Sequence, residues 1–145
     1  MEFVLTNEQK NLNYEGKQMG KIPAYRFEVS IIIGRFQPFH NGHLKSLQLA
    51  AKNSKKIIIV LGGYKMSLGI RGPWTAEERM IMIRSCLSKQ ILNRISFVFV
   101  RDRLYDEQLW LQNVRGEVTK LIGEETSVAL IGHEKDSSSY YLKIF

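Results

Sequence analysis

Short continuous apolar runs alternate along this chain with spaced apolar stripes, and the alternation predicts strands followed by helices. Continuous runs rich in β-branched residues predict four buried strands, at residues 27–33, 56–61, 95–100 and 127–131. Apolar positions spaced three and four residues apart predict helices at residues 43–53, 75–87 and 107–122, and a fourth helix beginning at residue 137.

Two of the predicted helices carry specific expectations. In the helix at residues 107–122 the apolar stripe is expected to be Leu109, Val114, Val118, Leu121 and Ile122. The helix at residues 75–87 opens with the spacing of a capping box, in which Thr75 accepts from the backbone and Glu78 reaches back. On this interpretation Glu78 and Arg79 lie in solvent, and Cys86 is a small core residue of the same helix.

Strands that are apolar along their whole length are typical of parallel sheets covered on both faces. The element order therefore predicts an α/β fold with a doubly wound parallel sheet. Residues 26–145 are expected to form this single domain, and residues 1–25, whose periodicity is weak, an N-terminal extension. In such sheets ligands bind beyond the carboxyl ends of the strands, and unusual polar segments follow Ile33, Leu61 and Ile131.

Composition narrows the class of protein. The chain has 145 residues, of which 44% are hydrophobic and 24% charged, as in ordinary globular proteins. One cysteine excludes an intrachain disulfide framework and a multi-cysteine zinc site. The longest apolar runs are far below the roughly 18 residues that span a bilayer, and no apolar signal core follows Met1. We therefore expect a cytoplasmic protein.

The net charge of +7 favours an anionic partner such as nucleic acid, acidic lipid or polyphosphate. Because the basic residues are scattered, a small polyphosphate fits as well as a nucleic acid, whose role here rests on charge alone.

The first candidate site is residues 34–43, Gly-Arg-Phe-Gln-Pro-Phe-His-Asn-Gly-His, directly after the first strand. Gly34 permits close approach of a ligand to the backbone. His40 and His43 flank Gly42 at a helix start, where imidazoles beside free N–H groups favour an anion. Arg35 adds a forked donor for phosphate. A purely structural turn, in which the histidines cap the helix, would use the same residues.

Three further segments have both a functional and an ordinary interpretation. Residues 71–79, with Arg71 and Trp74, also fit a simple helix start in which Trp74 belongs to the core. Trp110 and Asn113 lie on a helix whose tryptophan would ordinarily be core. After the last strand, three serines stand beside two charged residues and form either an anion cradle or a serine cap: Lys135, Asp136, Ser137, Ser138 and Ser139. Other nucleotide signatures, including a Gly-x4-Gly-Lys loop, Gly-x-Gly-x-x-Gly and a Nudix box, do not occur.

Residues 34–43 resemble the phosphate-binding motif of the HxGH nucleotidyltransferase superfamily, and the longer string resembles nicotinamide mononucleotide (NMN) adenylyltransferases. The resemblance runs from residue 29 to residue 145 and is nearest to the bifunctional branch, in which a Nudix hydrolase follows. It implies a Rossmann-like fold and the joining of ATP and NMN to give NAD and pyrophosphate. Many superfamily members carry a Ser/Thr-rich motif ending in arginine near the last strand, where this chain has Lys-Asp-Ser-Ser-Ser-Tyr-Tyr-Leu.

The resemblance also assigns roles. His40 and His43, assisted by Arg35, would stabilise charge on the reacting phosphates, while Trp110 stacks on nicotinamide and Asn113 assists. Contacts to ATP and its phosphates would come from Gly34, Phe36, Gln37, Gly42, Arg71, Lys135, Asp136, Ser137, Ser138 and Ser139. Lys135 is the expected cation for the terminal phosphates.

Mg²⁺ is expected to arrive with ATP, because no carboxylate cluster suggests a protein cage. The expected partners are ATP and NMN, without nucleic acid or membrane. A homo-oligomer and fusion to a Nudix domain in a longer parent chain are compatible with the resemblance.

Two alternatives stay open. One is a related adenylyl- or cytidylyltransferase with another phosphorylated acceptor, which should not depend on Trp110 if that acceptor is neutral and aliphatic. The other is a nucleotide-sensing domain without chemistry, against which the intact His40, Gly42 and His43 argue.

Overall fold

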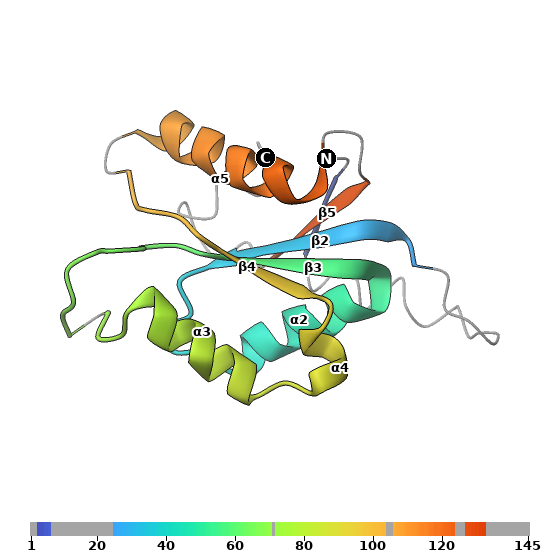
Figure 1. The fold of residues 1–145 in the computed structure, drawn as a ribbon, viewed down its shortest axis with the longest axis horizontal. Coiled ribbons are helices and arrows are strands. Elements are labelled where there is room, and N and C mark those ends of the chain that lie inside the picture. Colours follow the sequence, from blue (N-terminus) through green and yellow to red (C-terminus); the bar gives the residue numbers. More distant parts are fainter. Residues whose placement is uncertain (1–2, 7–24, 71, 104–105, 124–126, 133–145) are drawn as a thin grey trace.

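Parallel strands form the centre of the molecule. The structure, a computed structural model, describes residues 3–6, 25–70, 72–103, 106–123 and 127–132. Its strands are β1 (Phe3–Thr6), β2 (Phe27–Gly34), β3 (Ser54–Leu61), β4 (Ile95–Phe99) and β5 (Val128–Gly132). They make one parallel sheet in the order β1–β5–β2–β3–β4, in which Ile31 of β2 pairs with Ile58 of β3 and Leu130 of β5 (Figure 1).

Helices lie against both faces of this sheet. They are α2 (Asn41–Asn53), α3 (Ala76–Ser85), the short α4 (Lys89–Leu92) and α5 (Glu107–Ile122). Helix α5 covers one face, and α2, α3 and α4 cover the other (Figure 1). The predicted doubly wound α/β fold is therefore confirmed.

Each face of the sheet has its own apolar core, because successive residues of a strand point to opposite faces. The core on the α5 side is built largely from valines and isoleucines, including Ile31, Val60, Val114 and Val118. The core under α2 and α3 includes Ile32, Ile59, Leu47 and Ile83. Double coverage explains why the strands are apolar along their whole length.

Several element boundaries differ from the predicted ones. Helix α2 begins at Asn41, two residues before the predicted start, because His40 caps it. The predicted helix at residues 75–87 ends at Ser85, and α4 follows as a separate turn capped by Ser88. Strand β1 falls within the segment predicted as an extension and pairs with β5. The predicted fourth helix lies outside the described residues.

Three apolar assignments were wrong. Cys86 is exposed, because α3 ends before it and its backbone N–H caps the helix. Leu109 is 38% exposed, since two residues of helix turn it about 200° away from the buried Leu111. Leu121 is 51% exposed and lies beside the edge strand β4. Of the predicted stripe, Val114 and Val118 are buried.

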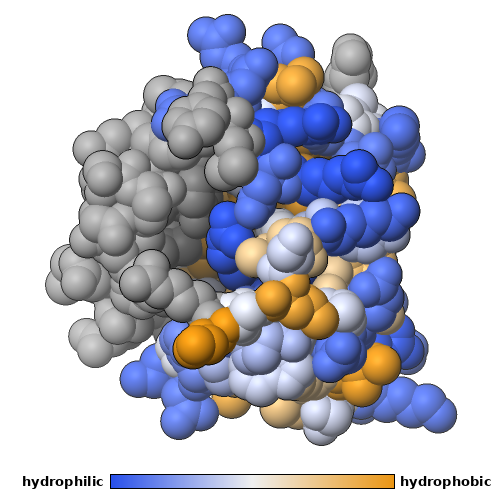
Figure 2. Space-filling model, turned by 90° about the vertical axis from the view of Figure 1, so that its left-hand side faces the viewer, coloured by the Kyte–Doolittle hydropathy of each residue, from blue (hydrophilic) through white to orange (hydrophobic). Residues whose placement is uncertain are grey.

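The carboxyl ends of β2 and β3 and the first turns of α2 and α5 lie at one end of the molecule, on the left in Figure 1. Figure 2 shows this end, where hydrophilic side chains gather over the upper and central part of the surface. Exposed basic residues follow three strands here, namely Arg35, Lys65, Arg101 and Arg103. Among the described residues, no helix has the length and apolar character needed to cross a membrane.

Candidate functional site

The turn between β2 and α2, residues 34–43, is the centre of the candidate site, and we call it the histidine turn. His40 is the N-cap of α2, and its Nδ1 accepts a hydrogen bond from the Gly42 N–H at 3.1 Å. In return, His43 Nδ1 accepts from the His40 N–H at 3.2 Å. The two histidines thus satisfy two backbone donors of the helix start, in the manner of a capping box.

Aromatic packing holds the histidine rings together. The His40 and His43 rings stack with centroids 3.7 Å apart, and Phe39 stacks on His43 at 5.7 Å. The buried Phe36 meets the edge of His43 at 4.6 Å. Phe36 has a φ of 55°, an unfavourable backbone conformation for a bulky side chain, which its burial stabilises.

These bonds fix the tautomer of each histidine ring. An Nδ1 that accepts an N–H bond carries no proton, so each neutral imidazole has its proton on Nε2. Both Nε2–H groups are then donors, placed at the positive end of the α2 dipole. Imidazole N–H donors at a helix start are the kind of group that binds the oxygens of an anion.

Two glycines of the histidine turn stand where a side chain would be crowded. A Cβ at Gly42 would lie 3.0 Å from Cε1 and 3.1 Å from Nδ1 of His40. A Cβ at Gly34 would lie 3.1 Å from the Phe36 ring. Glycine at both positions therefore permits the close packing of the turn on itself.

Arg35 is the predicted phosphate donor, and in this structure its guanidinium has protein partners. Nη2 donates to Asp102 Oδ2 at 2.7 Å, and Nη1 lies 3.5 Å from Met66 Sδ. Asp102 follows β4, so this ion pair links the ends of two strands. The Arg35 side chain is 54% exposed and so remains within reach of a ligand.

Gln37, which is predicted to contact the nucleotide, has protein partners in this structure. Its side-chain Nε2 donates to the Trp74 carbonyl at 2.9 Å, and its Oε1 accepts from the Trp74 N–H at 3.3 Å. Both polar atoms of the amide are therefore bonded to the segment that precedes α3. That segment begins α3 with Thr75, whose hydroxyl accepts from the Glu78 N–H at 3.1 Å. The Glu78 carboxylate accepts from the Thr75 hydroxyl at 3.2 Å and not from the backbone N–H of a full capping box.

Arg79 contradicts its prediction as a solvated residue, because it is 0% exposed. Its guanidinium donates to backbone carbonyls at the ends of β2 and β3 and at the start of α3. Desolvation by burial lowers the pKa of Arg79, and the nearby Arg35 charge acts in the same direction, whereas Asp102 and Glu77 raise it. Its position in sequence, next to Glu77 and Glu78 at a helix start, gave no signal of burial.

The other predicted residues divide into two groups. Trp110 and Asn113 are half-buried on α5, across the sheet from the histidine turn, and Trp110 packs against the core on that face (Figure 1). The remaining predicted contacts to ATP lie outside the described residues: Arg71, Lys135, Asp136, Ser137, Ser138 and Ser139.

Comparison with known proteins places this geometry in a family. The model of the cytidylyltransferase-like family matches residues 31–134, which include the histidine turn, α3 and Trp110. The chain belongs to the cytidylyltransferase-like family.

Relatives in this cytidylyltransferase-like family include adenylyltransferases. The nicotinamide/nicotinic acid mononucleotide adenylyltransferase of Acinetobacter baylyi is 44% identical over 121 residues, which cover 83% of this chain and 64% of that protein. A crystal structure of a bifunctional NMN adenylyltransferase/ADP ribose pyrophosphatase from Francisella tularensis matches with a TM-score of 0.72 and 38% identity, covering 81% of this chain and 35% of that one.

A second Francisella structure of that name, complexed with AMP and manganese, gives a TM-score of 0.71 at 38% identity, over 81% of this chain and 34% of that one. The chain thus spans less than two thirds of the Acinetobacter relative and about a third of the Francisella protein.

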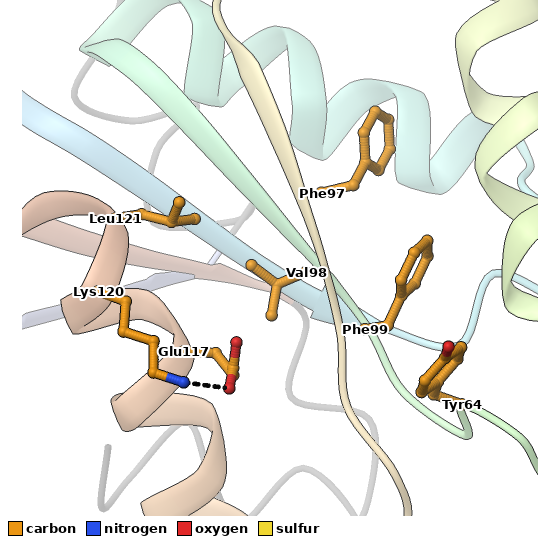
Figure 3. A pocket seen from close by; sticks show the side chains of 7 residues that line it. All are labelled: Tyr64, Phe97, Val98, Phe99, Glu117, Lys120 and Leu121. Carbon is orange, nitrogen blue, oxygen red and sulfur yellow. Dashed lines mark hydrogen bonds and ion pairs between the residues drawn. The ribbon is translucent and has the colours of Figure 1, made fainter.

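Metal-binding side chains do not gather in the described part of this cytidylyltransferase-like chain, where no group of three His, Cys, Asp or Glu residues is placed to hold an ion. A groove of about 390 Å³ lies elsewhere, along the edge strand β4 (Figure 3). Phe97, Phe99 and Tyr64 line it opposite the Glu117–Lys120 ion pair of α5. Because it contains none of the predicted site residues, the histidine turn remains the candidate site.

Proposed function

We propose that this chain is the adenylyltransferase part of a protein that joins ATP and NMN to give NAD and pyrophosphate. The observation that carries the proposal is the stacked histidine pair, whose two Nε2–H donors stand at the start of α2. The names of the Acinetobacter and Francisella relatives support the same reaction.

In the proposed reaction a phosphate oxygen of NMN attacks the α-phosphorus of ATP. The bond from the α-phosphorus to the bridging oxygen breaks, and pyrophosphate leaves with that electron pair. No protein nucleophile is needed, since positioning and stabilisation of charge suffice for such a transfer. His40 and His43 would donate Nε2–H bonds to the phosphate oxygens, and Arg35 would assist from the same turn.

Other proposed contacts complete the two substrates. Trp110 would stack on the cationic nicotinamide ring, with Asn113 nearby on α5. Lys135 and Ser137–Ser139, preceded by Asp136, would hold the β- and γ-phosphates, and Arg71 would meet the nucleotide beside them. We propose Mg·ATP as the substrate form, with the cation held by the phosphates. The Francisella structure with AMP and manganese supports a divalent cation.

We place this reaction in NAD biosynthesis in the cytoplasm, without a nucleic-acid or membrane partner. The bifunctional Francisella relative supports a longer parent chain that also carries a Nudix hydrolase. A homo-oligomer is compatible with the proposal.

The test is turnover with one acceptor at a time. Purified protein is mixed with ATP, Mg²⁺ and either NMN, nicotinate mononucleotide or phosphopantetheine, and the dinucleotide and pyrophosphate are measured. His43→Ala should lower kcat by about 10²- to 10³-fold, as expected for loss of one donor to the reacting charge. Gln48→Ala, an exposed change on the same helix, is the matched control and should leave kcat unchanged.

Each result has a defined meaning. NAD formation that depends on His43 supports the proposal. Turnover with phosphopantetheine alone would keep the nucleotidyltransferase chemistry and refute the acceptor. Binding of ATP without product from any acceptor would favour a nucleotide-sensing domain.

A further inference from the structure

Arg79 is a buried cation that the proposed reaction does not use directly. It stands in the first turn of α3, and its side chain is fully buried. Its hydrogen-bond acceptors are backbone carbonyl oxygens, whereas an arginine at a helix start is ordinarily solvated. Burial of a guanidinium charge is costly, and the carbonyl acceptors offset this cost only while the segments that carry them stay in place.

The carbonyls that Arg79 binds come from three separate elements. Nη1 donates to the Arg35 carbonyl at 2.5 Å and to the Gly62 carbonyl at 2.8 Å. Nη2 donates to the Gly63 carbonyl at 3.4 Å, and Nε donates to the Thr75 carbonyl at 3.2 Å. One planar group thus joins the end of β2, the end of β3 and the start of α3.

The hydrogen bond from Arg79 to the Arg35 carbonyl lies where the chain changes direction after β2. The Arg35 carbonyl belongs to the peptide that enters Phe36, the residue with a φ of 55° at which the chain turns toward His40. The Gln37 amide, bonded to Trp74, provides a second link from the same turn to the segment before α3. The histidine turn is therefore held at two points. Arg79 of α3 bonds to it at Arg35, and Trp74, just before α3, bonds to it at Gln37.

We propose that Arg79 is a positioning residue for adenylyl transfer, whose guanidinium fixes the histidine turn so that His40 and His43 face the reacting phosphates. This inference rests on the proposed function. Lysine cannot replace arginine here, because an ammonium group is a single point and cannot reach carbonyls on three elements at once.

The experiment compares Arg79→Lys with Arg84→Lys, an exposed arginine of the same helix. Arg79→Lys should lower kcat by about 10²-fold, the effect of a displacement near 1 Å at a reacting centre. The KM for NMN should change by less than about threefold, because Trp110 is on the opposite face of the sheet. Arg84→Lys should match the wild type, and thermal melts should show both variants folded at the assay temperature.

Chemical rescue separates positioning from folding. In Arg79→Ala, guanidinium ion at low, non-denaturing concentration should restore part of kcat, and sodium chloride or urea at the same concentration should not. If Arg79→Ala does not fold, Arg79→Gln keeps one NH₂ donor and is used in its place, with partial retention of kcat expected. Turnover of Arg79→Lys within about threefold of wild type would overturn the proposal.

A readout independent of turnover distinguishes this inference from the proposed function. The chain has three histidines, and in a His133→Gln background the ring-nitrogen signals of a ¹⁵N spectrum come from His40 and His43, two from each ring. Arg79→Lys should shift the signals of both rings, and Arg84→Lys those of neither. If the wild type makes no dinucleotide, the proposed function fails while the spectra still decide the positioning role. Unchanged imidazole signals in Arg79→Lys would overturn that role even in an active enzyme.

Discussion

The histidine turn and the first turns of α5 lie at the same end of the sheet but on opposite faces, and different forces hold them. In the histidine turn, polar side chains of His40, His43, Gln37 and Arg79 bond to backbone atoms. In α5, beyond the Asp106 cap on Leu109, apolar packing of Trp110, Val114 and Val118 dominates.

The difference in forces predicts a difference in sensitivity. Hydrogen bonds to backbone atoms fix direction, so small changes in the histidine turn should alter the chemical step. Apolar packing is non-directional, and its strength depends on the buried area. Changes at the start of α5 should therefore alter substrate binding or stability more than the chemical step.

Apart from the His43 and Arg79 variants described above, the largest effect should come from a single methyl group in the histidine turn. In Gly42→Ala the new Cβ meets the His40 ring, which its stacking on His43 keeps from moving away. We expect kcat to fall roughly 10- to 100-fold. Gly116→Ala in α5, where a Cβ meets nothing within 4 Å, is the control. It should raise stability by about 0.5–1 kcal/mol and leave turnover unchanged. Equal kinetics in the two variants would contradict the comparison.

Trp110→Ala should mainly weaken the binding of the acceptor, NMN. Loss of a cation–π contact worth about 1–2 kcal/mol predicts a KM for NMN raised roughly 5- to 30-fold, with kcat little changed. Trp110→Phe should retain part of the affinity, and Leu109→Ala, an exposed neighbour, should retain all of it. The measurement is steady-state kinetics with NMN varied. A fall in kcat alone would remove Trp110 from the acceptor site.

Gln37→Ala removes two hydrogen bonds between the histidine turn and Trp74. At about 0.5–1.5 kcal/mol for each bond, the free energy of unfolding should fall by roughly 1–3 kcal/mol. Turnover should fall by about fivefold, because the turn keeps its other link through Arg79. Denaturant titration and kinetics measure the two effects, with Gln48→Ala as control. A larger effect on ATP affinity than on kcat would instead support direct contact of Gln37 with the nucleotide.

The sequence predicted the structure correctly in the strands, where burial alone determines which residues are apolar. Runs such as residues 27–33 and 56–61 are apolar because both faces of the sheet are covered, and these runs predicted the strands and their parallel orientation. The N-cap of α3 by Thr75 was also predicted, because it depends on residues that are close in sequence.

Contacts between segments far apart in the sequence could not be predicted. The role of Arg79 depends on carbonyls 16 to 44 residues away, and carbonyls carry no side-chain signature. Nothing in the sequence indicated the two hydrogen bonds between the Gln37 side chain and the Trp74 backbone. Cys86 was misassigned because a helix pattern continued past the true end of α3.

The smallest effect should come from the exposed ion pair between Arg35 and Asp102. Exposed ion pairs contribute about 0–1 kcal/mol to stability, so Asp102→Asn should change the free energy of unfolding by no more than this amount. The asparagine removes a negative charge 2.7 Å from the guanidinium proposed to meet phosphate. We therefore expect the KM for ATP to fall about two- to fivefold at low salt, and less at high salt.

Glu117→Gln is the matched control for this last prediction, because it breaks an exposed ion pair with Lys120 on α5. It should change neither the KM for ATP nor kcat. If Asp102→Asn raises the KM for ATP instead, Asp102 holds Arg35 in its binding position rather than competing with phosphate for it. The sign of this small change thus decides whether the ends of β2 and β4 are linked to organise the site or to restrain it.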